Sequence, residues 1–281
     1  MTTDRGPAQD GARSRVEVVA LQLRARPGAV EANRERLAAA VRGLDGEPDL
    51  IVAPELCVTG YDLDRLGGHG HRLAETLQGP TVALAAELAA ERRATVVVGL
   101  LEADDGRLYD SAVVVGPGGV PASYRKSHLY PPETAVFAAG DRLLTTPSTA
   151  GHLGLMICFE HAFPEIATTL ALDGAQVLVI PSAVPVGYEH LLALRTRARA
   201  QDNQVFAVAA NLTGDGFCGG SMIADPRGEV LAAARAEEAA IRATIDLEAI
   251  QRERRREPAL RLRRAELYRA GPPAITGLSL G

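Results

Sequence analysis

The chain has 281 residues, of which 47% are hydrophobic and 23% charged, and its formal net charge is −5. This composition predicts a globular protein with a sizeable core, and the length suits one large domain or two small ones. The acidic balance argues against a nucleic-acid-binding face, since the one basic run, at 252–257, alternates with acids as a solvated helix face does.

In the first half of the chain, predicted strands alternate with predicted helices. Apolar residues recur at helical spacing from Val30 to Leu44 and from Pro80 to about Arg93. Apolar runs typical of strands lie at 16–23, 49–55, 95–102 and, on both sides of a Gly-Pro-Gly-Gly turn, within 107–126. No helix is expected after that turn, so it is not a phosphate-binding loop.

The second half continues the alternation and then adds paired strands. Helices are expected at 164–174, at 188–203 and from Glu248 onward. Strands are expected at 151–158, 176–182, 204–212 and 240–247, with a hairpin at 221–232. This order predicts an α/β protein in which helices cover sheets. We expect one domain at 15–270, a frayed tail at 1–14 and a C-terminal arm at 256–281 that contacts a partner subunit.

The remaining composition points to a reducing compartment. Three cysteines, Cys57, Cys158 and Cys218, are too few and too scattered for a disulfide framework. The N-terminus has no apolar signal-peptide region, and no apolar run is long enough to span a membrane. A cytoplasmic protein is therefore expected. The Gly-rich stretch around His69 and His71 predicts a solvated loop, and neither a metal nor an organic cofactor is expected.

Three predicted strands end in a reactive residue. The run IVAPE ends in Glu55, ASYRK in Lys126 and LGLMIC in Cys158. Ligands bind beyond the carboxyl ends of strands in open α/β sheets. A carboxylate can deprotonate a thiol, an ammonium ion favours the thiolate, and both an ammonium and a backbone N–H can stabilise an oxyanion. Taken singly each residue is more often structural, but together they favour a catalytic site.

At this point the sequence resembles the nitrilase superfamily of carbon–nitrogen hydrolases, in its amidase-like branch. The resemblance covers about Val16 to Arg269. Five blocks carry it, namely PELCVTGY (54–61), YRKSHLYPPETAVFAAG (124–140), ICFEHAFPE (157–165), RARAQDNQVFAVAANLTG (197–214) and GGSMIADPRGEVLA (219–232). It implies a four-layer αββα sandwich, a homodimer or higher homo-oligomer, and hydrolysis of a small linear amide through a thioacyl-enzyme.

The resemblance also implies residue roles. Glu55 is the general base, Lys126 stabilises the intermediate and Cys158 is the nucleophile. Glu133 orients the lysine and the substrate, and the backbone N–H of Phe159 is an oxyanion donor. By motif position, the substrate-binding residues are Tyr61, His161, Phe163, Val184 and Tyr188, while Cys57 and Cys218 are structural.

The substrate class stays open at this stage. Ala162 stands where many members carry an arginine that holds a substrate carboxylate, which favours a neutral or amine-bearing amide. The alternatives are an N-carbamoyl amide, as in carbamoylputrescine-type amidases, or a nitrile. A non-enzymatic scaffold on an inherited fold and a papain-like pairing of Cys158 with a histidine such as His161 rank lower, because they leave the glutamate and lysine idle.

Overall fold

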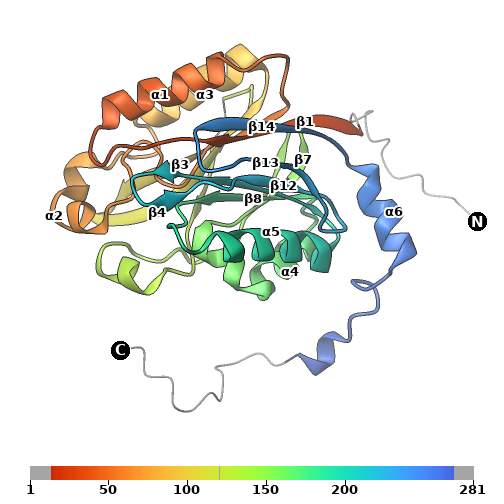
Figure 1. Ribbon diagram of the computed structural model, residues 1–281. Helices are drawn as coiled ribbons and strands as arrows, with labels where there is room; N and C mark the ends of the chain where they lie inside the picture. The colour runs from red at the N-terminus through yellow and green to blue at the C-terminus, as the bar shows by residue number, and fades with distance from the viewer. Residues whose placement is uncertain (1–13, 120, 269–281) are drawn as a thin grey trace, which may run out of the picture.

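Two six-stranded sheets lie face to face, and a pair of helices covers the outer face of each (Figure 1). The computed structural model describes residues 14–119 and 121–268. The four layers are the αββα arrangement that the resemblance implied, so this expectation is confirmed. None of the described helices is long and apolar enough to cross a membrane.

The first sheet is built from the first half of the chain and one late strand. Its strand order is β14-β1-β2-β3-β4-β5. The bounds are β1 Arg15–Gln22, β2 Leu50–Val52, β3 Thr95–Asp104, β4 Arg107–Val115, β5 Pro121–Arg125 and β14 Ala239–Asp246. Two helices cover it, α1 Val30–Arg42 and α3 Pro80–Arg92. Strands β1, β2 and β3 are parallel, so their carboxyl ends lie at one edge.

The second sheet repeats this plan. Its strand order is β13-β12-β9-β8-β7-β6, with β7, β8 and β9 parallel. The bounds are β6 Thr145–Ser148, β7 Gly151–Leu155, β8 Val177–Ser182, β9 Phe206–Asn211, β12 Met222–Ala224 and β13 Val230–Ala233. Helices α4 Pro164–Leu172 and α5 Glu189–Asn203 cover it, and a small hairpin pairs β10 Thr213–Gly214 with β11 Phe217–Cys218.

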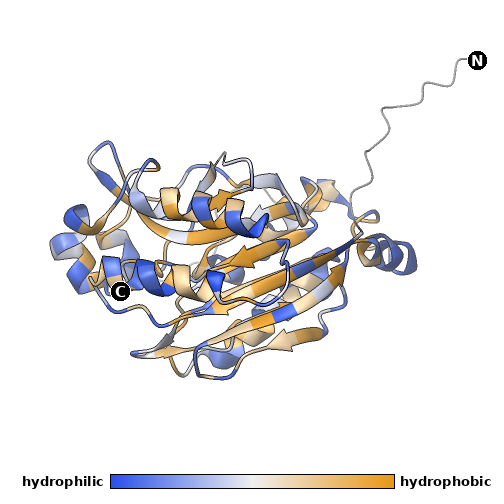
Figure 2. Cartoon of the chain, turned by 90° about the horizontal axis from the view of Figure 1, so that it is seen from above, coloured by the Kyte–Doolittle hydropathy of each residue, from blue (hydrophilic) through white to orange (hydrophobic). Residues whose placement is uncertain are grey.

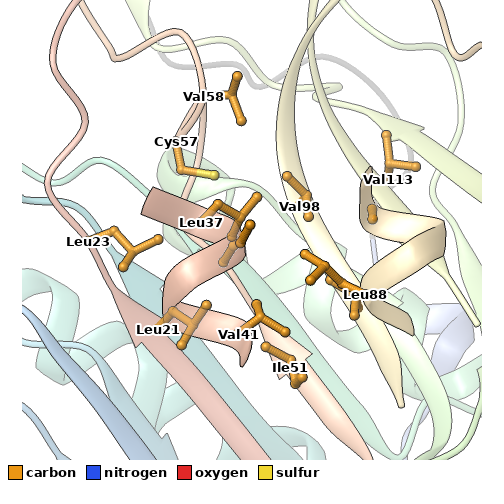
Figure 3. Close-up of a cluster of buried hydrophobic side chains, with 14 of the residues drawn as sticks. Leu21, Leu23, Leu37, Val41, Ile51, Cys57, Val58, Leu88, Val98 and Val113 are labelled. Atoms are coloured by element: carbon orange, nitrogen blue, oxygen red, sulfur yellow. The ribbon is translucent and has the colours of Figure 1, made fainter. Parts of the chain in front are cut away.

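Both faces of the central strands are buried, which explains why they read as continuous apolar runs. Along β1, Val19 and Leu21 pack in the cluster beneath α1 and α3, whereas Val18 and Ala20 pack against the opposite sheet. Figure 3 shows the first cluster, and Figure 2 shows how hydrophobic residues concentrate on the strands. Full burial of one such Val or Leu side chain contributes about 1.5–3 kcal/mol, so the two-sided core fixes the sheets in one register.

One predicted loop is a helix. The stretch with His69 and His71 forms α2 Leu63–Leu73, so the expectation of a solvated loop is wrong. The side chain of Asp62 caps the first turn by accepting a hydrogen bond from the Arg65 N–H at 3.0 Å, and Leu66 anchors the helix in the core. Buried Gly70 packs against Leu108, where a Cβ atom would meet that side chain, so the glycine serves close packing.

The C-terminal region follows the expected order. Helix α6 Glu248–Arg256 carries three of its four arginines in the last turn, and the short 3₁₀ helix η3 Ala265–Leu267 follows it. Leu262, Leu267 and Tyr268 on this arm are exposed. The predicted tail at 1–14 lies almost wholly outside the described residues, as does the arm beyond residue 268.

Candidate active site

The three predicted catalytic residues converge, and they come from both sheets. Glu55 lies three residues after β2 and Lys126 one residue after β5, so the first sheet supplies both. Cys158 follows β7 of the second sheet by three residues and begins the 3₁₀ helix η2 Cys158–Ala162. The strands therefore end slightly earlier than the sequence predicts, and the reactive residues lie on the turns that follow.

The turn that carries Glu55 rests directly on β3. Gly99 on this strand has no side chain, and a Cβ atom there would lie 2.7 Å from the Cα atom of Glu55. Leu56, the next residue, has a φ of 44°, in the left-handed region. Glycine at position 99 thus allows the strained turn to sit against the sheet and fixes the position of the carboxylate.

The ammonium group of Lys126 is the centre of a buried charge cluster. It donates hydrogen bonds to Glu55 Oε1 at 2.7 Å, to Glu133 Oε1 at 2.7 Å and to Asp110 Oδ2 at 3.3 Å. All four side chains are at most 1% exposed. Burial alone would lower the pKa of Lys126, but the charges of Glu55 and Asp110 outweigh it and hold that pKa well above its usual value.

Asp110, on β4, is a member of the site that the sequence reasoning missed. Oxygen atoms of Asp110, Glu55 and Glu133 lie within 4.8 Å of one another, as the ligands of a metal ion would. The Lys126 ammonium hydrogen-bonds to all three and is the cation of this cluster. Asp110 is also the acid in the apolar strand run LYDSAVVV, and an acidic residue in such a run is the signal that could have revealed it.

Glu133 is fixed by contacts on both carboxylate oxygens. Besides Lys126, the hydroxyl of Tyr61 donates to Oε1 at 2.7 Å, and the Tyr130 backbone N–H donates to Oε2 at 2.7 Å. Glu133 stands in the short 3₁₀ helix η1 Pro131–Ala135, which these bonds cap. These contacts fix the Glu133 carboxylate against the Lys126 ammonium group.

Cys158 lies beside the charge cluster and is held in a strained backbone conformation. Its φ is 46°, which a non-glycine residue rarely adopts. Burial and the charge of Glu55 raise the pKa of the thiol well above its usual value, and Lys126 lowers it by a smaller amount. Lys126 therefore favours the thiolate, as expected, but burial and the charge of Glu55 outweigh its effect on the pKa of Cys158. The sulfur is a thiol at rest, and the reaction requires a base.

Glu160 ties the nucleophile turn to the lysine turn. Its Oε1 accepts hydrogen bonds from the Tyr124 hydroxyl at 2.6 Å, the Ser127 N–H at 2.8 Å, the Ser127 hydroxyl at 2.6 Å and the His128 N–H at 3.1 Å. Its Oε2 accepts from the Ile157 N–H at 2.7 Å. This buried carboxylate thus joins residues beside Lys126 to residues beside Cys158 and bridges the two sheets.

We expect Glu160→Gln to loosen this bridge. Whichever way the amide is oriented, its NH₂ group faces backbone or hydroxyl donors that it cannot satisfy, so the free energy of unfolding falls by about 2–4 kcal/mol and kcat falls with it. Urea unfolding followed by circular dichroism, together with amide turnover, measures both effects. The matched variant Glu165→Gln changes an exposed glutamate nearby and should leave both unchanged.

A cavity of about 410 Å³ opens onto Cys158. Four of the five predicted substrate-binding residues line it, namely Tyr61, His161, Val184 and Tyr188. Phe163 is not among the lining residues, because its ring packs against Phe159 and His128 at centroid distances of 5.4 and 4.5 Å. Phe159 lines the cavity and follows the nucleophile directly, the place of the expected oxyanion donor.

Arg195, on α5, brings a positive charge to the same cavity, and no motif signalled it. Its Nη1 lies 3.3 Å from Nε2 of His161, which is 3% exposed. Burial and the charges of Arg195 and Arg199 lower the pKa of His161 to about 3. The imidazole is therefore neutral and accepts at Nε2, so it is unsuited to form the thiolate–imidazolium pair of a papain-like site.

The other two cysteines lie apart from this chemistry. Cys57 and Cys218 are buried, and neither lines the cavity. Burial raises the pKa of Cys57 to about 12 and that of Cys218 to about 11. Both remain thiols, which fits the structural role expected for them.

Known proteins are similar to this chain in sequence and in fold. The model of the carbon–nitrogen hydrolase family matches residues 17–255. The chain is 36% identical over 260 residues to an (R)-stereoselective amidase from Pseudomonas sp, covering 90% of this chain and 93% of the relative. It is 38% identical over 213 residues to a nitrilase from Pyrococcus abyssi, covering 73% and 79%. The crystal structure of a carbon–nitrogen hydrolase from Helicobacter pylori G27 matches with a TM-score of 0.81 at 26% identity, covering 92% and 98%. The chain therefore belongs to the carbon–nitrogen hydrolase family, within the nitrilase superfamily.

Proposed function

We propose that this enzyme is an amidase that hydrolyses a small linear amide to a carboxylic acid and ammonia, with Cys158 as nucleophile, Glu55 as base and Lys126 as oxyanion stabiliser. The single observation that carries the proposal is the buried contact of Lys126 with Glu55 and Glu133 beside a cavity that contains Cys158. The similarity to an amidase over 90% of the chain supports the same reaction class.

In the acylation half of the mechanism, Glu55 takes the proton of the Cys158 thiol while the sulfur attacks the amide carbon. The carbonyl electrons move to oxygen, where Lys126 and the Phe159 N–H stabilise the charge. Protonation neutralises Glu55, which weakens its hold on Lys126 just as the oxyanion forms. The carbon–nitrogen bond then breaks, the nitrogen takes the proton from Glu55, and ammonia leaves.

In the deacylation half, Glu55 removes a proton from water, and the resulting hydroxide attacks the thioester carbon. The same two donors stabilise the second oxyanion. The carbon–sulfur bond breaks, the acid leaves, and Cys158 regains a proton from Glu55. Every proton in this cycle is carried by Glu55, so the scheme requires no cofactor.

The cavity limits the size and character of the substrate. Its lining combines aromatic and aliphatic side chains with acidic or basic side chains, among them Glu133, Arg195 and Asp215. Ala162 leaves the turn after the nucleophile without a cation, which favours a neutral or amine-bearing amide over an N-carbamoyl acid. Arg195 puts a positive charge into the cavity from another element, so substrates with a carboxylate tail belong in the same screen.

Nitrile hydrolysis is the second candidate, because the same thiol can attack a nitrile carbon and a nitrilase is among the relatives. Matched amide and nitrile pairs of equal chain length, with ammonia and acid measured, separate the two. We expect kcat/KM for the amide to exceed that for the nitrile. Faster release of acid and ammonia from the nitrile would make the enzyme a nitrilase.

Iodoacetamide labelling at neutral pH tests the alternative that the protein is a non-enzymatic scaffold, which requires an unreactive Cys158.

We further propose that the enzyme is a cytoplasmic homo-oligomer, at least a dimer. Leu262, Leu267 and Tyr268 expose apolar surface on the C-terminal arm, and Leu172 and Leu194 expose it on α4 and α5. Exposed large apolar side chains of this kind favour contact with a second copy. Light scattering gives the mass of the particle in solution, and a monomer would contradict this assignment.

A further inference from the structure

The charge cluster around Lys126 holds more acid than base. Glu55, Asp110 and Glu133 contribute three carboxyl groups, and Lys126 contributes one ammonium group. All four groups are buried, so two excess negative charges would lie in a site with almost no water. Such a site lowers its free energy by binding a proton.

The positions of the carboxyl groups locate this proton. Oxygen atoms of Asp110 and Glu55 lie within 4.8 Å of one another, and two carboxyl groups this close can form a hydrogen bond only if one of them carries a proton. Each also has one buried oxygen, Oδ1 of Asp110 and Oε2 of Glu55, that accepts from no donor among the described residues. A proton shared between the two side chains satisfies both.

The distances indicate which of the two side chains holds it. Lys126 lies 2.7 Å from Glu55 Oε1 but 3.3 Å from Asp110 Oδ2, so the ammonium group favours the charged form of Glu55 more strongly. Burial, followed by the charge of Glu55, raises the pKa of Asp110 well above its usual value.

We propose that Asp110 is a neutral carboxylic acid that donates a hydrogen bond to Glu55 and so positions the catalytic base. The bond fixes the Glu55 carboxylate relative to Cys158. Asp110 touches neither the substrate nor the reacting atoms, and its proton does not enter the reaction. The proposal deepens the proposed function, since it concerns the base of the same reaction.

Asparagine mimics a protonated aspartic acid in shape and hydrogen bonding. In Asp110→Asn, the amide NH₂ donates to Glu55 and the amide oxygen accepts from Lys126. We expect kcat/KM within about threefold of the wild type and both limbs of its pH profile unmoved. Asp110→Ala leaves Glu55 without its donor, so kcat should fall about 10- to 100-fold, the effect of losing a hydrogen bond to a charged group, while KM changes little.

Infrared difference spectroscopy detects the proton directly and needs no substrate. Wild-type enzyme labelled with ¹³C-aspartate should show the C=O stretch of a buried protonated carboxylic acid at neutral pH, and Asp110→Asn should lose it. Asp64→Asn, at an exposed position on α2, should keep it. Absence of the band in the wild type, or a shift of the Asp110→Asn pH limbs toward acid, would overturn the proposal. Failure of the amidase function alone would leave the infrared result unchanged.

Discussion

Cys158→Ala is expected to abolish turnover while leaving the fold intact. Without the sulfur no thioacyl-enzyme forms, so kcat should fall on the order of 10⁴-fold or more, as when other enzymes lose their nucleophile. The half-buried thiol makes no disulfide, and alanine fits its place, so the unfolding midpoint should stay close to the wild type. Ammonia release and urea unfolding measure the two quantities.

The other cysteines provide the control for this variant. Cys218→Ala removes a buried thiol outside the catalytic cluster and should keep turnover within a few fold, with a modest loss of stability. Appreciable activity in Cys158→Ala would refute the role of Cys158. So would mass spectrometry of denaturant-quenched turnover that finds the acyl group on another residue.

Lys126→Met is expected to damage both stability and catalysis. The variant leaves three buried carboxyl groups without a counterion, so the free energy of unfolding near pH 7 should fall by about 3–5 kcal/mol. Loss of the oxyanion donor should lower kcat by about 10²- to 10³-fold. The chain has no tryptophan, so urea unfolding is best followed by circular dichroism.

The stability loss in Lys126→Met should depend on pH. Burial raises the pKa of Asp110 and Glu133 in the folded wild type, and removing the ammonium group raises both further. Groups with raised folded pKa values stabilise the fold below the unfolded carboxyl pKa of about 4 and lose this contribution as pH rises. The difference from wild type should therefore be small at pH 4 and grow toward pH 7. An equal loss of unfolding free energy at pH 4 and at pH 7 would show that packing, not charge, is responsible.

The exposed arginine Arg72 on α2 gives the matched control for Lys126→Met. Arg72→Met removes a surface cation and should change neither the free energy of unfolding nor kcat.

The protonation state of Lys126 can also be measured directly, because it is the only lysine in the sequence. Labelling with ¹⁵N-lysine gives a single side-chain signal from the centre of the site. That signal should remain an ammonium resonance up to high pH, as the raised pKa of Lys126 requires.

The sequence predicts most of the fold because its strands and helices are strongly patterned. Buried runs such as 95–102 are too apolar for anything but a core strand, and Pro164 and Gly174 mark both ends of α4. Helix α2 was not predicted because its glycines and histidines have low helix propensity. Its stability comes from the Asp62 cap and from packing.

The meeting of Glu55, Lys126 and Cys158 could be predicted because each stands in a motif at a strand end, whereas the residues that support them could not be predicted. Asp110 lies in mid-strand, and its role follows only from the pairing that brings β4 beside β5 and Lys126. Arg195 reaches the cavity from α5, 34 residues after His161, and this proximity depends on helix packing. Glu160 lies in the block ICFEHAFPE, but its donors Tyr124 and Ser127 lie on or beside β5 of the other sheet, and the sequence does not show that pairing.

The division of the site between two sheets has a mechanical consequence. Glu55 and Lys126 belong to one sheet and Cys158 to the other, and side-chain packing between the sheets, together with contacts such as those of Glu160, holds them in alignment. A slip of one sheet over the other by a fraction of a residue would separate sulfur from carboxylate without melting a single strand. Heating or pressure should therefore abolish turnover before the protein unfolds. Mutations of side chains packed between the sheets should change kcat without touching the site.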